Sequence, residues 1–396
     1  MRCWLITLTI FSSLTLGHEK LTSENAPKTI LFWNTEQKLE GFGNIKEILP
    51  TRQVSKSQNF YPFRYDLLDL SNLKYKFKGE EFSLEDFIQT FKIAGLIVIR
   101  NGVILYESYD FGNDETTKWI SFSVTKSVTS MLLGAAIKDG HIKSVEDKVT
   151  IYLPQLLNSN YQDVSIKQVL QMSSGIDWNE DYEDPLSDVN IAGALNSLNL
   201  YEYLNNLNKK SSAGNKFNYN TGETNLIGGI VRAAIGDNLS NYLEKKIWKP
   251  FGMEFNAYWV IDTDYEQELG GCCLNATLRD YARLGMFAMN NGKLNNGVEI
   301  LPKNWMKDST TPSRNNSYYG YQWWLDGPAY QSFYADGIFG QFIWIDPVSK
   351  TVVAMHAARD RADVDSFVGG HRLNFMVSLI EAVSYTHLRA HETIAD

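Results

Sequence analysis

Residues 123–140 read SVTKSVTSMLLGAAIKDG, and this stretch predicts a buried helix with a reactive pair at its start. Apolar side chains recur through it at helical spacing, and Gly140 stands where a C-terminal cap belongs. Ser123 and Lys126 lie one turn apart, so the lysine amine can reach the serine oxygen on the same helix face. The helix start adds free N–H groups and a positive dipole end. The stretch therefore predicts a serine nucleophile with a built-in base.

The four-residue pattern is weak when taken alone, because the chain contains a second copy at Ser71 to Lys74. That copy leads into Tyr75 to Lys78, which alternates like a surface strand, whereas Ser123 opens about four turns of small and aliphatic residues. An ordinary N-cap serine followed by a solvated lysine would give the same pattern. The pattern leaves both interpretations of Ser123 open.

Length and composition describe an ordinary globular protein with a large core. The chain has 396 residues, of which 44% are hydrophobic and 21% are charged. The net charge of -9 argues against a nucleic-acid partner, because phosphate binding needs a basic stripe. The sequence contains no His-Glu-x-x-His, Cys-x-x-Cys or glycine-rich phosphate loop, so we expect neither a metal nor a cofactor.

The two ends of the chain differ from the rest. Residues 1–17 have a basic start and an uncharged apolar run too short to span a bilayer, which is typical of a secretory signal. We therefore expect a periplasmic or secreted protein with no integral membrane segment after signal removal. Residues 384–396 resemble translated sequencing-adaptor sequence, so we treat them as a non-native tail and the functional domain as residues 18–383.

Cys272 and Cys273 are the only cysteines beyond the signal, and they are neighbours. Adjacent Cα atoms lie about 3.8 Å apart across a trans peptide, below the roughly 4.4 Å lower end for ordinary disulfides. We expect these cysteines to be unbridged.

The order of predicted elements indicates an α+β fold. Two hairpins are expected, at residues 96–106 around Asn101-Gly102 and at residues 342–355 around Asp346-Pro347. Helices are expected between them, at 123–139, 166–172, 225–235 and 278–289, with a terminal helix at 367–383. We predict one antiparallel sheet built from both chain ends, flanked by helices, with a mainly helical lobe inserted in it.

Histidine is scarce where a base would be needed. Only His141, His356 and His371 remain once the leader-adjacent and tail histidines are set aside, and no Gly-x-Ser-x-Gly motif exists. A Ser-His-Asp hydrolase is therefore disfavoured.

Six motifs in order resemble the serine β-lactamase and penicillin-binding-protein superfamily, closest to its 6-aminohexanoate-dimer hydrolase and related esterase branch. The resemblance runs from about residue 93 to 383 and implies a β-lactamase/transpeptidase-like fold. The motifs are Ser123–Ser127, Gly175–Tyr182, Tyr219–Thr221, Asn275–Arg283, Gln322–Trp324 and Gly337–Gln341.

The resemblance implies that Ser123 attacks a carbonyl and that Lys126 and Tyr219 share the proton transfers. A free lysine, with a pKa of about 10.4, is protonated at neutral pH, but burial lowers that value. Tyr219, beside the cation, would hold a phenolate or relay the proton. The backbone N–H groups of Ser123 and Ile338 would form the oxyanion hole. The expected substrate-binding residues are Tyr182, Trp178, Thr221, Gly337 and Phe339, and Trp323 and Trp324 are further candidates for apolar walls.

Two features bear on the substrate. Ala335-Asp336-Gly337 stands where antibiotic-recognising relatives carry Lys-Thr-Gly, so position 335 offers no cation for a penicillin carboxylate. The segment 177–188 carries six carboxylates and is either a solvated acidic loop or a lid that favours amines. We expect a serine hydrolase that cleaves a small linear amide or ester through an acyl-enzyme. The alternatives are a D-alanyl peptidase or β-lactamase, and an acyl-binding sensor without turnover.

Overall fold

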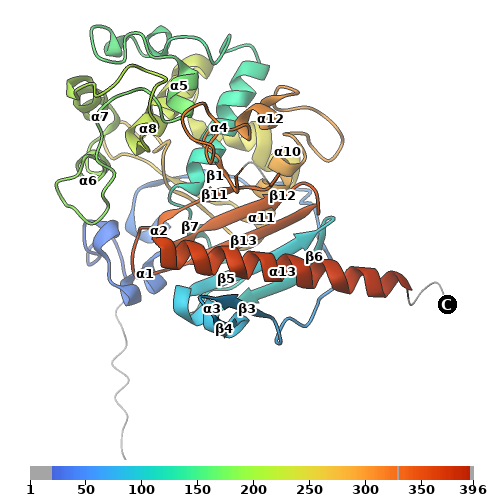
Figure 1. Ribbon diagram of the computed structural model, residues 1–396. Helices are drawn as coiled ribbons and strands as arrows, with labels where there is room; N and C mark the ends of the chain where they lie inside the picture. The colour runs from blue at the N-terminus through green and yellow to red at the C-terminus, as the bar shows by residue number, and fades with distance from the viewer. Residues whose placement is uncertain (1–19, 328–329, 393–396) are drawn as a thin grey trace, which may run out of the picture.

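The computed structural model describes residues 20–327 and 330–392, with side chains through Ser384. Its centre is a seven-stranded sheet in the order β10-β11-β12-β13-β5-β6-β2 (Figure 1). The strands are β2 (Arg64–Tyr65), β5 (Ile93–Arg100), β6 (Val103–Tyr109), β10 (Trp324–Leu325), β11 (Phe333–Asp336), β12 (Phe342–Asp346) and β13 (Thr351–Ala357).

Both predicted hairpins are present, and they join the two ends of the chain. Asn101 and Gly102 adopt positive φ angles of 52° and 75° in the turn between β5 and β6. Strand β13 pairs antiparallel with β5, so the C-terminal hairpin continues the N-terminal one. The predicted antiparallel sheet is confirmed for these strands, but the edge strand β2 pairs with β6 in parallel.

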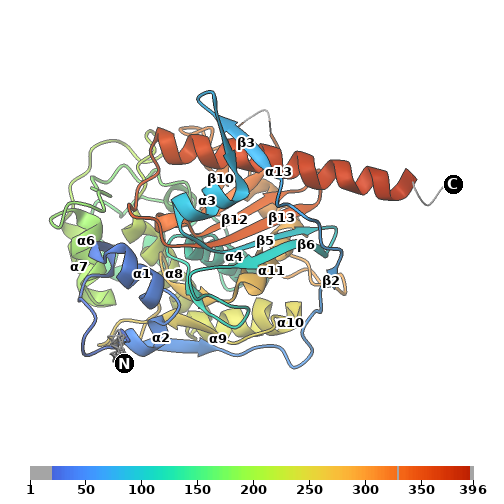
Figure 2. The ribbon, with the colours of Figure 1, turned by 90° about the horizontal axis from the view of Figure 1, so that it is seen from below.

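Helices cover both faces of this sheet, which explains why β13 is buried along its whole length. One face packs on α11 (Leu278–Met289), and Ile97 and Ala354 belong to the same core cluster as Leu284 of that helix. The other face packs on α3 (Leu84–Phe91) and α13 (Ser366–Glu392), which crosses the sheet in Figures 1 and 2. Successive strand residues alternate between these two clusters, as the pleat requires.

The helical lobe lies above the sheet in Figure 1. Its central helix is α4 (Val124–Lys138), and every residue from Val124 to Ala136 is buried, as expected of a helix that is apolar or small on all sides. The predicted helix 123–139 is thus confirmed. The surrounding helices are α5 (Ile166–Leu170), α6 (Asp188–Gly193), α7 (Ser197–Asn206), α8 (Thr221–Ile235) and α9 (Leu239–Leu243), followed by a π-helix (Glu244–Trp248), α10 (Lys249–Phe251) and, later, α12 (Trp305–Ser309).

Helix α8 begins four residues before the predicted start at residue 225. The Asn220 side chain accepts a hydrogen bond from the Glu223 N–H and caps the helix. The tyrosine motif Tyr219–Thr221 is therefore the N-terminus of a helix, and its residues face the start of α4.

A second, four-stranded sheet was not predicted. Its order is β1-β8-β9-β7, with β1 (Thr51–Val54), β7 (Trp119–Ile120), β8 (Ala257–Val260) and β9 (Leu274–Ala276). Strand β7 ends three positions before Ser123, and β9 begins directly after the two cysteines. Their pairing brings residues 271–273 beside the start of α4.

The N-terminal part of the described chain adds three short elements ahead of β1: η1 (Ile30–Phe32), α1 (Thr35–Gly41) and α2 (Ile45–Ile48). A small hairpin, β3 (Lys74–Phe77) and β4 (Glu80–Ser83), precedes α3. The expected signal segment, residues 1–17, lies outside the described residues. At the other end, α13 runs to Glu392, nine residues past the predicted helix end at 383.

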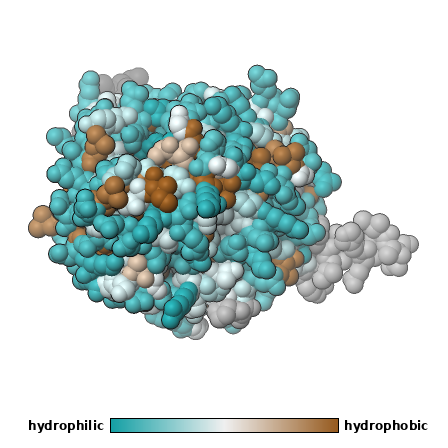
Figure 3. Space-filling view, turned by 90° about the horizontal axis from the view of Figure 1, so that it is seen from above, coloured by the Kyte–Doolittle hydropathy of each residue, from teal (hydrophilic) through white to brown (hydrophobic). Residues whose placement is uncertain are grey.

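The outer surface on the side of the helical lobe is mainly hydrophilic, and its hydrophobic side chains form small separate groups (Figure 3). Across residues 20–327 and 330–392, no helix has the combination of length and apolar character that a bilayer crossing requires.

Candidate active site

Ser123 lies at the tight junction between β7 and α4. Its side chain makes no capping hydrogen bond, although the residue occupies the N-cap position. The preceding residue, Phe122, has a φ of 43°, a left-handed conformation that costs energy for a bulky side chain and that clusters at functional sites. The second copy of the motif is different, because Ser71 is exposed on the loop before β3. The Ser123 hydroxyl is therefore not used to cap the helix.

Lys126 is buried, with 2% of its surface exposed. Its Nζ lies 2.9 Å from each of three oxygens: Ser123 Oγ, Thr221 Oγ1 and the Gly271 carbonyl. Burial lowers the pKa of this amine to about 8, even though the nearby Glu180 carboxylate acts to raise it. The alternative of a solvated lysine beside a capping serine does not describe this site.

Tyr219 completes the group from the turn before α8. Its ring centroid lies 5.2 Å from Lys126 Nζ, and its interaction with the Ser123 side chain acts to lower the pKa of its hydroxyl. The ring stacks on Trp324 at 5.5 Å, which fixes its orientation. Burial, and next the charge of Glu180, raise the pKa of Tyr219 well above its ordinary value. The tyrosine is therefore a neutral phenol, not the phenolate that the sequence allowed.

Glu180 is a member of the site that sequence reasoning left in the acidic loop. Its carboxylate accepts hydrogen bonds from the Thr221 N–H at 3.0 Å and from the Tyr182 hydroxyl at 2.8 Å. It also accepts from the Thr221 hydroxyl and the Trp178 indole. The spacing of the sequence could have indicated this role of Glu180. Trp178 and Tyr182 each stand two residues from Glu180, so all three side chains share one face of an extended segment.

The two expected oxyanion donors are placed together. No backbone acceptor pairs with the N–H of Ser123 or Ile338 in the part of the chain that the structure describes. Ile338 begins a short turn, η5 (Ile338–Gly340), and both residues line the same hollow. Gly337 allows this approach, because a Cβ at that position would lie 2.5 Å from the Ser121 carbonyl oxygen.

Two cavities meet at Ser123. We call the first the inner cavity; it measures about 620 Å³ and is lined by Lys126, Thr221 and Trp178, together with part of the N-terminal segment. We call the second the vestibule; it measures about 630 Å³ and is lined by Tyr219, Trp324 and Gly337. Ser123, Tyr182 and Ile338 line both cavities. A substrate whose reacting bond lies at Ser123 would thus have space for one of its halves in each cavity.

Two of the expected wall residues lie elsewhere. Phe339 is buried and lines neither cavity; its ring packs 5.3 Å from Phe122 and carries Lys38 Nζ over its face at 4.1 Å. Trp323 is likewise buried in the main core. Both residues therefore belong to the core and not to the cavity walls.

The carboxylates of the acidic loop fall into two groups: some line the vestibule, and others accept hydrogen bonds within the loop. Glu180, Asp181 and Glu183 line the vestibule, together with Asp336 and Asp363. Asp184 and Asp188 instead accept hydrogen bonds from backbone N–H groups of the loop.

The vestibule also contains the cations that position 335 lacks. Arg361 pairs with Glu183 at 2.9 Å, and Arg372 pairs with Asp336 at 2.9 Å. Five carboxylates against two guanidinium groups leave the vestibule negatively charged.

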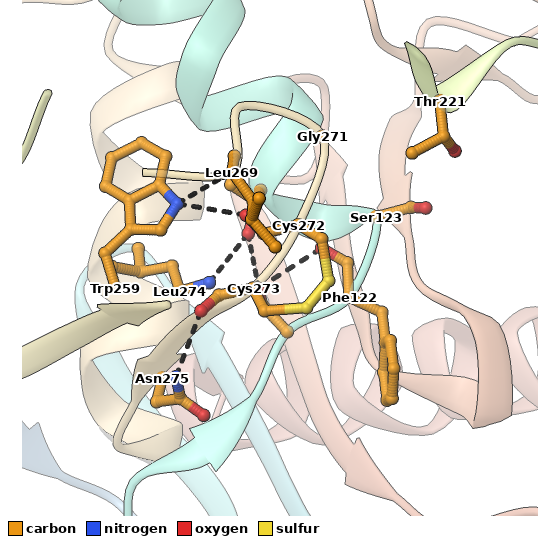
Figure 4. The surroundings of a disulfide bond; sticks show 12 residues. Phe122, Ser123, Thr221, Trp259, Leu269, Gly271, Cys272, Cys273, Leu274 and Asn275 are labelled. Carbon is orange, nitrogen blue, oxygen red and sulfur yellow. Dashed lines mark hydrogen bonds between the residues drawn. A yellow bond between two sulfur atoms is a disulfide. The ribbon is translucent and has the colours of Figure 1, made fainter. Parts of the chain in front are cut away.

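The prediction of unbridged cysteines is wrong in this structure. Cys272 and Cys273 form a disulfide across a cis peptide, with a Cα–Cα distance of 3.3 Å, whereas the sequence argument assumed a trans peptide. Figure 4 shows the disulfide on the segment that passes beside Ser123. The Trp259 indole donates to the carbonyls of Leu269 and Cys272, and so holds this segment in place.

The histidines take no part in this group. His356 is buried against Trp119 and Asn113, and burial lowers its pKa to about 3, so it stays neutral. His371 contacts the Tyr75 hydroxyl on the far face of the sheet. Within the described residues, no group of three or more His, Cys, Asp or Glu side chains is arranged to hold a metal ion.

Comparisons with known proteins agree with this geometry. Residues 84–373 match the family model described as β-lactamase. The chain belongs to the β-lactamase family. It is a serine hydrolase with the β-lactamase/transpeptidase-like fold.

Individual relatives point to one branch of the family. The chain is 28% identical over 335 residues to a 6-aminohexanoate-dimer hydrolase from Paenarthrobacter ureafaciens, covering 79% of this chain and 83% of that protein. The structure of a putative 6-aminohexanoate-dimer hydrolase from Bacillus anthracis superposes with a TM-score of 0.80 at 23% identity, covering 91% of this chain and 99% of that one. A class C β-lactamase superposes with a TM-score of 0.56 at 18% identity, covering 72% and 92%.

Proposed function

We propose that this hydrolase cleaves a small linear amide or ester through an acyl-enzyme. In this proposal Ser123 is the nucleophile, Lys126 is its base and Tyr219 passes a proton to the leaving group. The observation that carries the proposal is the set of three oxygens around the Lys126 amine.

The partners of Lys126 determine what the amine does when it is neutral. The Gly271 carbonyl can only accept a hydrogen bond, and the Thr221 hydroxyl donates its own proton to Glu180, so it too accepts from Lys126. The two N–H groups of a neutral amine are thereby used. The lone pair remains for the Ser123 hydroxyl at 2.9 Å, which is the arrangement of a general base.

The later steps use the groups on the other side of Ser123. The N–H groups of Ser123 and Ile338 stabilise the oxygen that becomes negative as the carbonyl is attacked. Tyr219, which is neutral and next to Ser123, gives its proton to the leaving amine or alcohol and regains one from Ser123 through Lys126. The released half leaves, and water then hydrolyses the acyl-enzyme by the same groups in reverse.

The charge of the vestibule supports a neutral or amine-bearing substrate. Excess carboxylates attract a cationic leaving group and repel an anion such as a penicillin. The Paenarthrobacter relative is named a 6-aminohexanoate-dimer hydrolase, which fits a small-molecule substrate that bears an amine.

The first experiment is labelling with a fluorophosphonate followed by peptide mapping. We expect the label on Ser123 and its loss in Ser123→Ala, together with a fall in turnover on the order of 10⁶-fold. Ser71→Ala is the matched control and should be silent. Turnover that persists in a clean preparation of Ser123→Ala would end the proposal.

A second candidate is a peptidase or β-lactamase that recognises a substrate carboxylate. Arg361 and Arg372 favour it, because they supply cations beside Gly337. Both guanidinium groups are already paired with carboxylates, however, so they offer a substrate little free charge. A panel of acyl esters, linear amides and cephalosporins distinguishes the two, and a burst without turnover would instead identify an acyl-binding sensor.

A further inference from the structure

We propose that the inner cavity is an acyl pocket that binds an unbranched apolar acyl chain of medium length. This inference rests on the proposed function, because it assigns the two halves of the substrate to the two cavities at Ser123. It adds a specificity that the family match does not supply.

The position of Tyr219 determines which cavity holds the leaving half of the substrate and which holds the acyl half. The group that protonates the leaving amine or alcohol must contact it, and Tyr219 lines the vestibule but not the inner cavity. The leaving half therefore occupies the acidic vestibule. The acyl half, on the opposite side of the carbonyl, extends into the inner cavity past Lys126.

Most of the free surface of the inner cavity is apolar. Ile30, Leu31, Phe122, Val189 and Leu269 line it.

Its three carboxylates are already engaged within the protein. Asp262 accepts from the Ser197 hydroxyl and the Tyr265 N–H. Asp264 accepts from the Asn196 side chain. Glu268 pairs with Arg52 and accepts from the Ser240 N–H. A substrate amine that entered would lose water without gaining an unengaged carboxylate partner, which is unfavourable.

The outer wall of the pocket comes from residues 23–50, a segment that precedes the family match at residues 84–373. Several contacts hold this segment in place. Lys38 Nζ donates to the carbonyls of Arg359 and Asp360. The Phe42 ring packs on Phe122, next to the nucleophile, with ring centroids 5.2 Å apart. The pocket is therefore formed before substrate binds.

The size of the cavity sets the expected selectivity. A volume of about 620 Å³ is within the range of pockets that enclose small organic ligands. Each methylene that enters an apolar pocket improves binding about fourfold. If the gain is retained in the transition state, kcat/KM rises roughly 250-fold from an acetyl to a hexanoyl ester of the same alcohol.

The test is a series of esters with one leaving group and acetyl, butyryl, hexanoyl, octanoyl and 6-aminohexanoyl acyl groups. We expect kcat/KM to rise with chain length and the hexanoyl ester to exceed its 6-aminohexanoyl counterpart. Leu31→Asp should reduce the hexanoyl-to-acetyl ratio by about tenfold, because it places a charge in the apolar wall. Phe32→Asp is the matched control: Phe32 is adjacent and 47% exposed, and it does not line the cavity, so the ratio should persist.

A variant that fills part of the inner cavity tests the chain-length preference independently. Ala192 lines the inner cavity, and Ala192→Phe should shift the preferred acyl group to a shorter chain, with the melting temperature measured alongside. A flat chain-length series, or a 6-aminohexanoyl ester that exceeds the hexanoyl ester, would overturn the acyl pocket while leaving the hydrolase proposal intact. Absence of both ester turnover and Ser123 labelling would instead refute the proposed function itself.

Discussion

The pH dependence of kcat/KM is the most direct test of Lys126 as the base. Only the neutral amine can accept the Ser123 proton, so the rate follows the fraction of Lys126 that has lost its own. Burial lowers the pKa of Lys126 to about 8. At pH 7 roughly 10% of the amine is then neutral, compared with about 0.04% for a free lysine. Burial thus contributes about 200-fold to the reactive population at pH 7.

The expected profile is a single rising limb. For a neutral substrate, kcat/KM should increase about tenfold between pH 7 and pH 9 and then level off, with an apparent pKa that belongs to the coupled site. Tyr219 should add no falling limb in this range, because burial and Glu180 raise its pKa far above 10. The assay is a neutral ester followed at constant ionic strength, corrected for spontaneous hydrolysis.

Glu180→Gln tests the electrostatic cause. The Glu180 charge acts to raise the pKa of Lys126, so its removal should move the limb to lower pH. A limb centred near 10.4 would mean that burial does not perturb Lys126. A limb near 6.5 would point to a histidine base, and an alkaline shift in Glu180→Gln would contradict the assigned charge coupling.

Three further outcomes are expected. Lys126→Met should alter the pH dependence of stability. In the wild type the unfolded chain holds the lysine proton up to about pH 10.4, whereas the folded chain releases it near pH 8. The unfolding free energy of the wild type should therefore rise relative to that of the variant by roughly 2–3 kcal/mol between pH 7 and pH 10. A constant difference in denaturant titrations would show that Lys126 is not perturbed. Tyr219→Phe keeps the ring that stacks on Trp324, so the melting temperature should hold while kcat falls by about 10²–10⁴-fold; near-normal kcat would exclude the relay. Asp181→Asn combined with Glu183→Gln should lower kcat/KM for amine-bearing leaving groups several-fold at low salt and leave neutral ones unaffected, with the effect shrinking as salt screens charges over about 10 Å at 0.1 M. Equal losses for both substrates would refute charge selection.

Local patterns predicted much of the architecture. The periodic apolar run after Ser123 identified α4, and Asn101-Gly102 identified the β5–β6 turn, because both signals lie within a few residues. The start of α8 was missed although Asn220 and Glu223 have N-cap spacing, since the apolar run begins later. The second sheet was missed because its strands of two to four residues are too short to show alternation.

The contacts of the site depend on segments far apart in the chain, which explains what sequence could and could not supply. Ser123 and Lys126 were predictable as a pair because one helix turn joins them. The Gly271 carbonyl reaches Lys126 only through the pairing of β7 with β9, and no local pattern indicates that pairing. The Cys272–Cys273 disulfide was excluded by assuming a trans peptide, which local sequence does not decide.

A carboxylate near an amine base raises the pKa of the amine and so reduces the fraction that is neutral. In this site the effect of Glu180 on Lys126 is limited. Glu180 acts on Lys126 through the Thr221 hydroxyl, not by direct contact, and the burial of the amine outweighs the remaining attraction. In return Glu180 fixes the direction of the Thr221 hydroxyl proton, so that Thr221 can only accept from Lys126. The lone pair of the amine is then left facing Ser123, and orientation is gained at the expense of part of the pKa shift.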